Sequence, residues 1–339
     1  MMYYRPLVVT DPALAADALP LAGGPHGFAM VEVLSRGAPP TLMPASAVPE
    51  PWLTALTAPR APIAGVDWSE PRLMAVLNAT PDSFSDGGLA EGPAALTRAE
   101  ALIGAGADIL DVGGESTRPG ARPVDPGTEF QRVNAVITAM AEAHPDCPIS
   151  VDTRKGEVAE AAIAAGARIW NDVSALTYEP ENLDRATRLG VPICLMHAQG
   201  HPETMQDNPR YDNVLLDVYD ALAARIAAVE AAGIPRARLM VDPGIGFGKT
   251  LRHNVTLIQG LALFHGLGCP ILLGVSRKGF IGAIGLEPDK RARAPGSIAV
   301  GLAALGQGVQ ILRVHDMAET KQAVRLWRAL HPGAAGRQR

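Results

Sequence analysis

The sequence has few cysteines and no excess of basic residues, and each of these absences excludes a class of protein. Its three cysteines, Cys147, Cys194 and Cys269, form neither a CxxC pair nor a metal-ligand spacing. Cys194 and Cys269 lie in or beside apolar runs, so we expect reduced thiols in the core. A net charge of −5 and an isoelectric point near 5.9 give no electrostatic footprint for nucleic acid. The basic residues are dispersed, which argues against an anionic membrane surface as a partner.

Signals for secretion and membrane insertion are also missing. The first ten residues lack a basic region followed by an apolar block, and Asp11 interrupts the stretch after them. Residues 294–312 carry no charge and are long enough to span a bilayer, but they contain Pro295 and four glycines. A helix followed by a buried strand is the better prediction there. We therefore expect a cytoplasmic protein.

The composition divides the chain into a short unusual part and a long regular one. Hydrophobic residues make up 47% and charged residues 19% of the 339 residues, which is ordinary for a globular protein. Residues 1–70 are rich in Pro and Ala and predict loops with one strand at 28–34. We favour a loosely packed N-terminal extension of unknown role, with packing against the main domain or a dimer surface as the alternative. Residues 71–331 form the expected main domain, and 332–339 a short tail.

Eight short apolar runs follow one another in the main domain, and each leads into polar residues that can do chemistry. The runs are LMAVL before Asn78, DILDV before residues 113–118, ISV before Asp152, ARIW before Asn171 and Asp172, VPICL before Met196 and His197, RLMV before Asp242, PILLGV before Ser276, Arg277 and Lys278, and QILRV, which contains Arg313 and precedes His315 and Asp316. Strands buried on both faces read as such runs.

Helical patterns separate the runs. Apolar residues recur at three- and four-residue spacing over 94–104, 128–143, 155–165, 213–232, 251–264, 296–306 and 316–330. Asp316 is the predicted N-cap of the last helix, with Glu319 completing a capping box. This alternation predicts an α/β protein with a (β/α)8 TIM barrel, in which the carboxyl ends of the strands meet at one site.

Two loops after strands exceed the usual two to six residues, and a third region imitates a phosphate loop. Residues 78–88 and 113–120 are long and rich in turn-forming residues, as binding loops on a barrel often are. Residues 244–250 read GIGFGKT, but the first Gly of a Walker A motif is replaced by Pro243. Lys249 stands where a dinucleotide fingerprint needs Gly.

Eight motifs occur in an order that resembles the dihydropteroate synthases, which are pterin-binding enzymes of folate biosynthesis. They are NATPDSFSDGG, DVGGESTRPGA, VDT, NDVSA, LMHAQG, DPGIGFGKT, GVSRKGFIG and RVHD. The resemblance covers residues 71–330. It implies a transferase that condenses (7,8-dihydropterin-6-yl)methyl diphosphate with 4-aminobenzoate, releasing 7,8-dihydropteroate and diphosphate. It also implies a homodimer and a sulfonamide target.

The resemblance assigns a role to each cluster. Pterin-binding positions are Asp152, Asn171, Met196, Asp242 and Lys278. Arg313 and His315 are expected to hold the diphosphate, and Asn78 to bind the Mg²⁺ that accompanies it. The positions expected around the aminobenzoate are Phe84, Thr117, Arg118, Pro119, Phe247 and Gly279.

Catalytic roles and one departure from the family follow from the same positions. Asp152, Lys278, Arg313 and His315 are the expected catalytic residues. Many relatives have Ser where this chain has Gly279, so a hydroxyl contact to the aminobenzoate carboxylate is lost and a backbone N–H at the start of the following helix must serve.

Three alternatives remain open at this point. A pterin-binding methyltransferase would share the pterin pocket, but GESTRPG and SRK argue against it. A Schiff-base aldolase would use Lys278 as its nucleophile. A silent paralogue would bind pterin without turnover.

Overall fold

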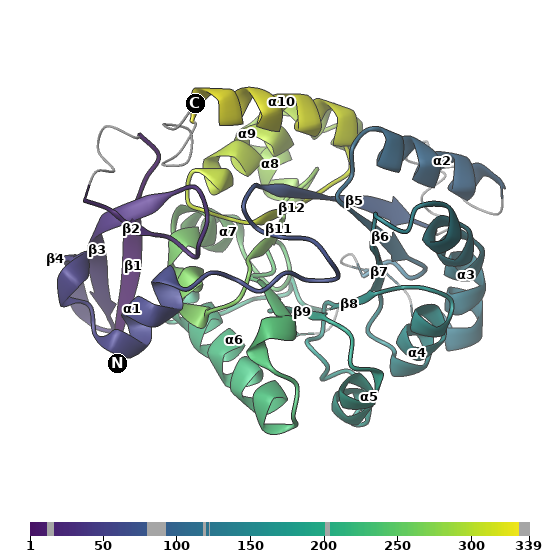
Figure 1. Cartoon of the computed structure of the whole chain (residues 1–339), viewed down its shortest axis with the longest axis horizontal. Coiled ribbons are helices and arrows are strands. Elements are labelled where there is room, and N and C mark those ends of the chain that lie inside the picture. The colour runs from purple at the N-terminus through teal and green to yellow at the C-terminus, as the bar shows by residue number, and fades with distance from the viewer. Residues whose placement is uncertain (12–16, 80–92, 118–119, 122, 201–203, 332–339) are drawn as a thin grey trace.

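A barrel of parallel strands carries a smaller antiparallel sheet at its side (Figure 1). This computed structural model describes residues 1–11, 17–79, 93–117, 120–121, 123–200 and 204–331. Within these ranges the two sheets pack around separate apolar clusters, and a third cluster fills the amino-terminal end of the barrel.

Each of the eight predicted apolar runs forms a strand of the barrel. The strands are β5 (Arg72–Asn78), β6 (Ile109–Gly113), β7 (Ile149–Asp152), β8 (Ile169–Asp172), β9 (Ile193–Met196), β10 (Leu239–Asp242), β11 (Leu272–Gly274) and β12 (Ile311–Val314). Their order is β10-β9-β8-β7-β6-β5-β12-β11, all parallel. A parallel bridge between Val241 and Ile271 brings the two ends of the sheet together. The predicted TIM barrel is therefore confirmed.

Helices surround the strands. They are α2 (Pro93–Gly104), α3 (Pro126–Ala143), α4 (Gly156–Ala164), α5 (Asn182–Leu189), α6 (Val214–Ala231), α7 (Leu251–Gln259), α8 (Gly279–Ile284), α9 (Ala294–Leu305) and α10 (Met317–Leu330), with 3₁₀ turns η4 (Arg236–Arg238), η5 (Leu261–Leu267) and η6 (Lys290–Arg293). The uncharged stretch forms α9 and β12, as predicted. No helix in the described ranges is long and apolar enough to cross a membrane. The helix α5 was not predicted, because its eight residues are too few for a periodic pattern to stand out.

The capping box predicted for α10 does not form. Asp316 is at the N-cap position, but its carboxylate makes no capping hydrogen bond. It pairs instead with Arg277, whose Nε lies 3.1 Å from Asp316 Oδ2. The ion pair satisfies the carboxylate, and it ties the turn after β11 to the turn after β12.

The barrel interior changes from apolar to polar along the strands. Met74, Ile109, Ile169, Cys194, Met240, Leu272 and Ile311 form one buried layer at the amino-terminal end. Ile63, Val66 and Trp68 pack against this layer, so the segment that crosses the end of the barrel between α1 and β5 in Figure 1 closes it. Because strand side chains alternate, the residues two positions further along face the interior as well. These residues are mostly polar.

The described part of the first 70 residues folds into a packed sheet and a helix rather than a loose extension. The strands are β1 (Met2–Val9), β2 (Leu19–Pro20), β3 (Gly27–Ser35) and β4 (Ala38–Pro44), followed by η2 (Ala45–Ala47) and α1 (Glu50–Thr57). Tyr3 donates to Asp220 of α6 at 2.8 Å, and Trp52 stacks on Tyr219 with ring centroids 5.4 Å apart. The prediction of one strand was too low. Among the described residues, proline-rich β4 pairs with β3 alone, and proline is tolerated in such an edge strand.

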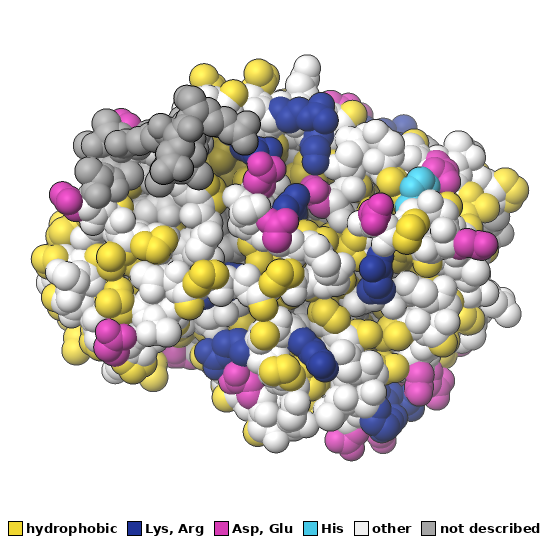
Figure 2. Space-filling model, viewed as in Figure 1, with side chains coloured by type: hydrophobic (Ala, Val, Ile, Leu, Met, Phe, Trp, Pro, Cys, Tyr) yellow, Lys and Arg dark blue, Asp and Glu magenta, His cyan; other side chains and the backbone are white. Residues whose placement is uncertain are grey.

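Surface charge and thiols agree with the composition. All three cysteines are free and buried. Among the side chains coloured in Figure 2, Lys and Arg are intermingled with Asp and Glu rather than gathered into a basic patch.

Candidate functional site

The carboxyl ends of the barrel strands bring most of the predicted site residues into one polar layer. Asp152 pairs in register with Asn171 and with Gly113, and Met196 pairs with Asp242. Gly274 pairs with Arg313. These pairs lie at the carboxyl ends of their strands, and the contacts of Arg313 with Asp111 and Asp152 join residues far apart in the sequence at the barrel mouth.

Arg313 is held between two carboxylates. Its Nε lies 2.6 Å from Asp111 Oδ2, and its Nη2 lies 2.6 Å from Asp152 Oδ2. Asn171 Nδ2 donates to the same Asp111 at 3.2 Å. One cation thus serves two acids, and these contacts use two of the five guanidinium N–H donors.

The carboxyl group of Asp152 has a raised pKa. Burial raises its pKa to about 7, with Arg313 opposing the rise and Asp111 adding to it. Its second oxygen, Oδ1, is buried and has no hydrogen-bond partner among the described residues. A buried acceptor without a donor is costly, so this oxygen is suited to an N–H group of a ligand.

Asp242 and Lys278 form the opposite wall of the layer. Gly244 N donates to Asp242 Oδ1 at 2.7 Å. Burial raises the pKa of Asp242 and lowers that of Lys278 to about 8, and each charge partly offsets the shift of the other. Lys278 Nζ donates to the Ile245 carbonyl and lies 4.6 Å from the centroid of the Phe247 ring.

Two glycines leave space in this layer. A Cβ on Gly274 would lie 3.7 Å from Asp242 Oδ2 and 3.9 Å from Arg313 Cδ, and one on Gly113 would lie 3.6 Å from Asp152 Oδ2. A side chain at either position would occupy the space between the polar groups. Because neither glycine has a side chain, this space stays open for a flat ligand that contacts several of the polar groups at once.

The GIGFGKT segment is a wall of the site. Gly244 has a φ of 69°, and a Cβ there would lie 1.8 Å from the His197 carbonyl oxygen, so only glycine fits. Lys249 is buried, and its Nζ lies 3.0 Å from His197 Nδ1 and 3.0 Å from the Phe247 carbonyl oxygen. This lysine fastens the segment to the end of β9.

The remaining predicted residues lie around the rim. Asn78 ends β5 half-buried, and Thr117 lies half-buried in the loop after β6. His315 Nδ1 lies 3.0 Å from Ser276 Oγ, which connects the ends of β12 and β11. Gly279 is exposed at the start of α8, and a Cβ there would meet no atom within 4 Å. The predicted positions Phe84, Arg118 and Pro119 lie outside the described residues.

Asp111 is the site residue that sequence reasoning missed. It was included in an apolar run, yet it is completely buried and contacts both Arg313 and Asn171. The available signal was an acidic residue inside a buried strand, because such a residue is almost never buried without a partner.

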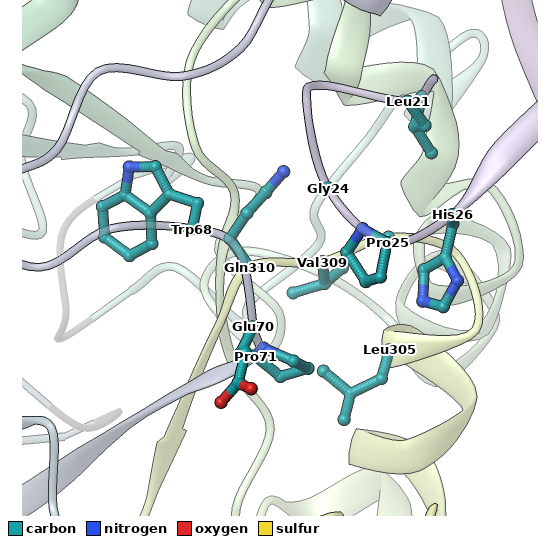
Figure 3. A pocket seen from close by; sticks show the side chains of 11 residues that line it. Leu21, Gly24, Pro25, His26, Trp68, Glu70, Pro71, Leu305, Val309 and Gln310 are labelled. Atoms are coloured by element: carbon teal, nitrogen blue, oxygen red, sulfur yellow. The ribbon is translucent and has the colours of Figure 1, made fainter. Parts of the chain in front are cut away.

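A small cavity at the other end of the barrel is unsuited to a substrate. It has a volume of about 20 Å³, room for a single water molecule. Figure 3 shows it between Leu21, Pro25 and His26 of the N-terminal part and Trp68, Pro71 and Gln310, the last two directly before β5 and β12. The polar layer is thus the better candidate site.

Comparisons with known proteins point to one family. The sequence matches the family described as pterin binding enzyme over residues 74–315. It is 47% identical over 262 residues to a dihydropteroate synthase of Escherichia coli (strain K12), covering 77% of this chain and 92% of that protein. It is 48% identical over 265 residues to that of Neisseria meningitidis serogroup C, covering 77% and 93%.

The solved structures to which this chain is similar are also dihydropteroate synthases. A structure of Xanthomonas albilineans dihydropteroate synthase with 4-aminobenzoic acid aligns with a TM-score of 0.74 at 44% identity, covering 80% of this chain and 98% of that one. The same enzyme in complex with 7,8-dihydropteroate aligns with a TM-score of 0.71 at 41% identity, covering 80% and 98%. Yersinia pestis dihydropteroate synthase in a sulfonamide drug complex gives 0.76 at 42% identity, covering 79% and 97%.

Proposed function

The chain belongs to the pterin binding enzyme family, and we propose that it acts as a dihydropteroate synthase. It condenses (7,8-dihydropterin-6-yl)methyl diphosphate with 4-aminobenzoate to give 7,8-dihydropteroate and diphosphate. The observation that carries this conclusion is the polar layer in which Asp111, Asp152, Asn171 and Arg313 contact one another.

The pterin ring matches the polar layer. Its 2-amino-4-oxo edge offers several N–H donors and a carbonyl acceptor. In the proposed complex Asp242 accepts from the amino group and ring N–H, and Asn171 both donates and accepts. Asp152 Oδ1 accepts from another ring nitrogen, Lys278 reaches the carbonyl and N5, and Met196 lines the slot.

The diphosphate lies next to the ring. We assign it to Arg313, which has donors beyond those used by the two carboxylates, and to His315. A Mg²⁺ ion fits this arrangement, because the Asn78 side chain offers an oxygen at the end of β5, beside the Gly113–Asp152 pair. Mg²⁺ keeps several waters and needs few protein ligands. When bound to Asn78, it would neutralise charge on the diphosphate.

The aminobenzoate approaches from the rim. We assign its pocket to Thr117, Arg118 and Pro119 of the second loop, with Phe84 and Phe247. Its carboxylate is placed at the backbone N–H groups that begin α8 at Gly279. Sulfonamides, one of which is in the Yersinia pestis complex, are expected to compete for this pocket.

The protein residues promote the reaction by positioning and by charge. The bond between the methylene carbon and the diphosphate oxygen breaks, and its electron pair leaves with the diphosphate. The cation left on the methylene is delocalised by the pterin ring and stabilised by the Asp152 carboxylate. The aminobenzoate nitrogen, held in line by the loops, attacks this carbon and loses a proton.

Assembly and location complete the proposal. The resemblance supports a homodimer, and the large apolar side chains of Ile284, Leu286 and Leu326 are exposed and available for such a contact. Three free buried thiols are in keeping with the reducing cytoplasm. Sedimentation of the purified chain tests the dimer.

Pyrophosphate release that depends on both substrates is the decisive experiment. We expect release with dihydropterin diphosphate and 4-aminobenzoate together, and none when 4-aminobenzoate is omitted. Release without aminobenzoate, or no release with both, would overturn the proposal. Borohydride trapping in the presence of a carbonyl substrate should give no adduct on Lys278, which separates this enzyme from a Schiff-base aldolase.

A further inference from the structure

Four charged side chains are buried beneath the second loop, outside the polar layer. Glu115, Glu129, Arg154 and Lys155 are between 1% and 8% exposed. The two acids and two bases balance in charge. Charged groups are seldom buried this deeply unless they are paired, and a buried pair usually gains little stability over apolar residues of the same shape. Their burial therefore points to a positional role.

Lys155 and Glu115 hold together the two ends of the segment 115–124, which includes Thr117 of the second loop. Lys155 Nζ lies 2.5 Å from Glu115 Oε2 and 2.5 Å from the Val124 carbonyl oxygen. Val124 N donates to Glu115 Oε2 at 2.8 Å. Glu115 lies two residues before Thr117, and Val124 lies seven residues after it. We refer to Glu115, Val124 and Lys155 as the loop clasp.

The clasp is also bound to the strand that carries Asp152. Lys155 Nζ lies 2.5 Å from Glu129 Oε2, and Glu129 Oε1 accepts from Thr153 Oγ1 at 2.6 Å. Thr153 directly follows Asp152. Arg154 Nε donates to Glu115 Oε1 at 2.9 Å. The loop with Thr117 and the strand end with Asp152 are therefore joined by one chain of charge-assisted hydrogen bonds, which are the stronger kind.

We propose that Lys155 and Glu115 are positioning residues that set the second loop for aminobenzoate relative to the bound pterin. This inference rests on the proposed function, because it assigns the loop to the aminobenzoate pocket. Neither residue is expected to touch a substrate. The clasp ties Glu115 and Val124 together on either side of Thr117, and in-line attack by the amine depends on where this loop holds the aminobenzoate.

The test measures the effect on each of the two substrates separately. In Glu115→Gln and in Lys155→Met we expect the KM for 4-aminobenzoate to rise at least about tenfold, since charge-assisted hydrogen bonds to the loop are lost. Pterin affinity, measured by calorimetry with the pterin alone, is expected to stay within about twofold. If Lys155→Met fails to fold, the double variant Glu115→Gln/Lys155→Met keeps the balanced charges of Arg154 and Glu129, and the same rise in KM is expected.

The matched control is Glu160→Gln on α4, the helix that begins directly after Lys155. It removes a surface ion pair with Arg185, in which Glu160 is 52% exposed, and both parameters should remain unchanged. An unchanged KM in the clasp variants, or an equal loss of pterin affinity, would overturn the positioning role. Wild-type turnover in the same assay tests the proposed function separately, so the two ideas can fail independently.

Discussion

Replacing Asp111 with Asn tests whether the carboxylate hidden in β6 organises the pterin pocket. Asp111 Oδ2 accepts from Arg313 Nε at 2.6 Å and from Asn171 Nδ2 at 3.2 Å. An amide at this position has only one oxygen and no charge. With its oxygen at the Oδ2 position the amide could accept from both donors, but its NH2 group would then face Asn171 Nδ2, which lies 3.4 Å from Oδ1, and the negative charge paired with Arg313 is lost.

The expected loss corresponds to one hydrogen bond to a charged group, about 1.5–3 kcal/mol. That free energy is about a 10- to 150-fold loss of pterin affinity. Calorimetric titration with a pterin measures it directly. The expected kcat/KM for the pterin substrate falls by a similar factor, because the contact is lost in the bound state and in the transition state alike.

The same substitution should move the pH profile. Burial and the charge of Asp111 raise the pKa of Asp152 to about 7, while Arg313 opposes them. The reaction needs Asp152 ionised, so kcat/KM for the pterin substrate should rise with pH through about 7 in the wild type. Without the negative charge of Asp111 beside it, the ionised form of Asp152 is less disfavoured, so the pKa of Asp152 falls. The rising limb should therefore move to lower pH even as the maximal rate drops.

Asp108→Asn is the matched control. Asp108 lies three residues before Asp111, at the amino-terminal end of the barrel, and accepts from Leu73 N at 2.9 Å. Its replacement should reduce stability without changing pterin affinity or the pH limb. The reasoning would be refuted if Asp111→Asn bound pterin as tightly as the wild type, or if its pH limb stayed in place.

Three further predictions test other parts of the molecule. Asp242→Asn should weaken pterin binding about 10- to 150-fold by calorimetry, since it removes a charge-assisted contact, and unchanged affinity would contradict the assignment. Gly279→Ser should cause no loss of stability, because a Cβ at this position would meet no atom within 4 Å. It should have a lower KM for aminobenzoate than Gly279→Ala, and equal KM values would rule out a hydroxyl contact. Trp52→Ala should lower the free energy of unfolding in urea by about 2 kcal/mol, less than for a fully buried Trp, and no change would show that its stacking on Tyr219 is not stabilising.

The barrel could be predicted from the sequence because burial on both faces leaves a strong mark. A strand such as Leu239–Asp242 has apolar residues facing both the helices and the interior, and only its last residue is polar. In the sequence, the polar residue that follows such an apolar run therefore marks the end of the strand. Asp111 escaped notice because it lies within a run, where its neighbours Leu110 and Val112 face the helices. Its role depends on Arg313, which is 202 positions away, and local patterns carry no information about such a partner.

The N-terminal sheet was underpredicted for a different physical reason. Its stability comes from contacts with the barrel as well as from its own apolar cluster. Arg36 pairs with Asp217 and Asp220 of α6, and Arg60 donates to the His265 carbonyl oxygen. None of these partners is near in sequence. Proline in β4 also resembles a loop signal, although proline at an edge blocks unwanted pairing with another chain. A segment that is stabilised by packing against the barrel needs only a weak periodic pattern of apolar residues. Its strands can therefore be recognised from the barrel contacts and not from its own sequence.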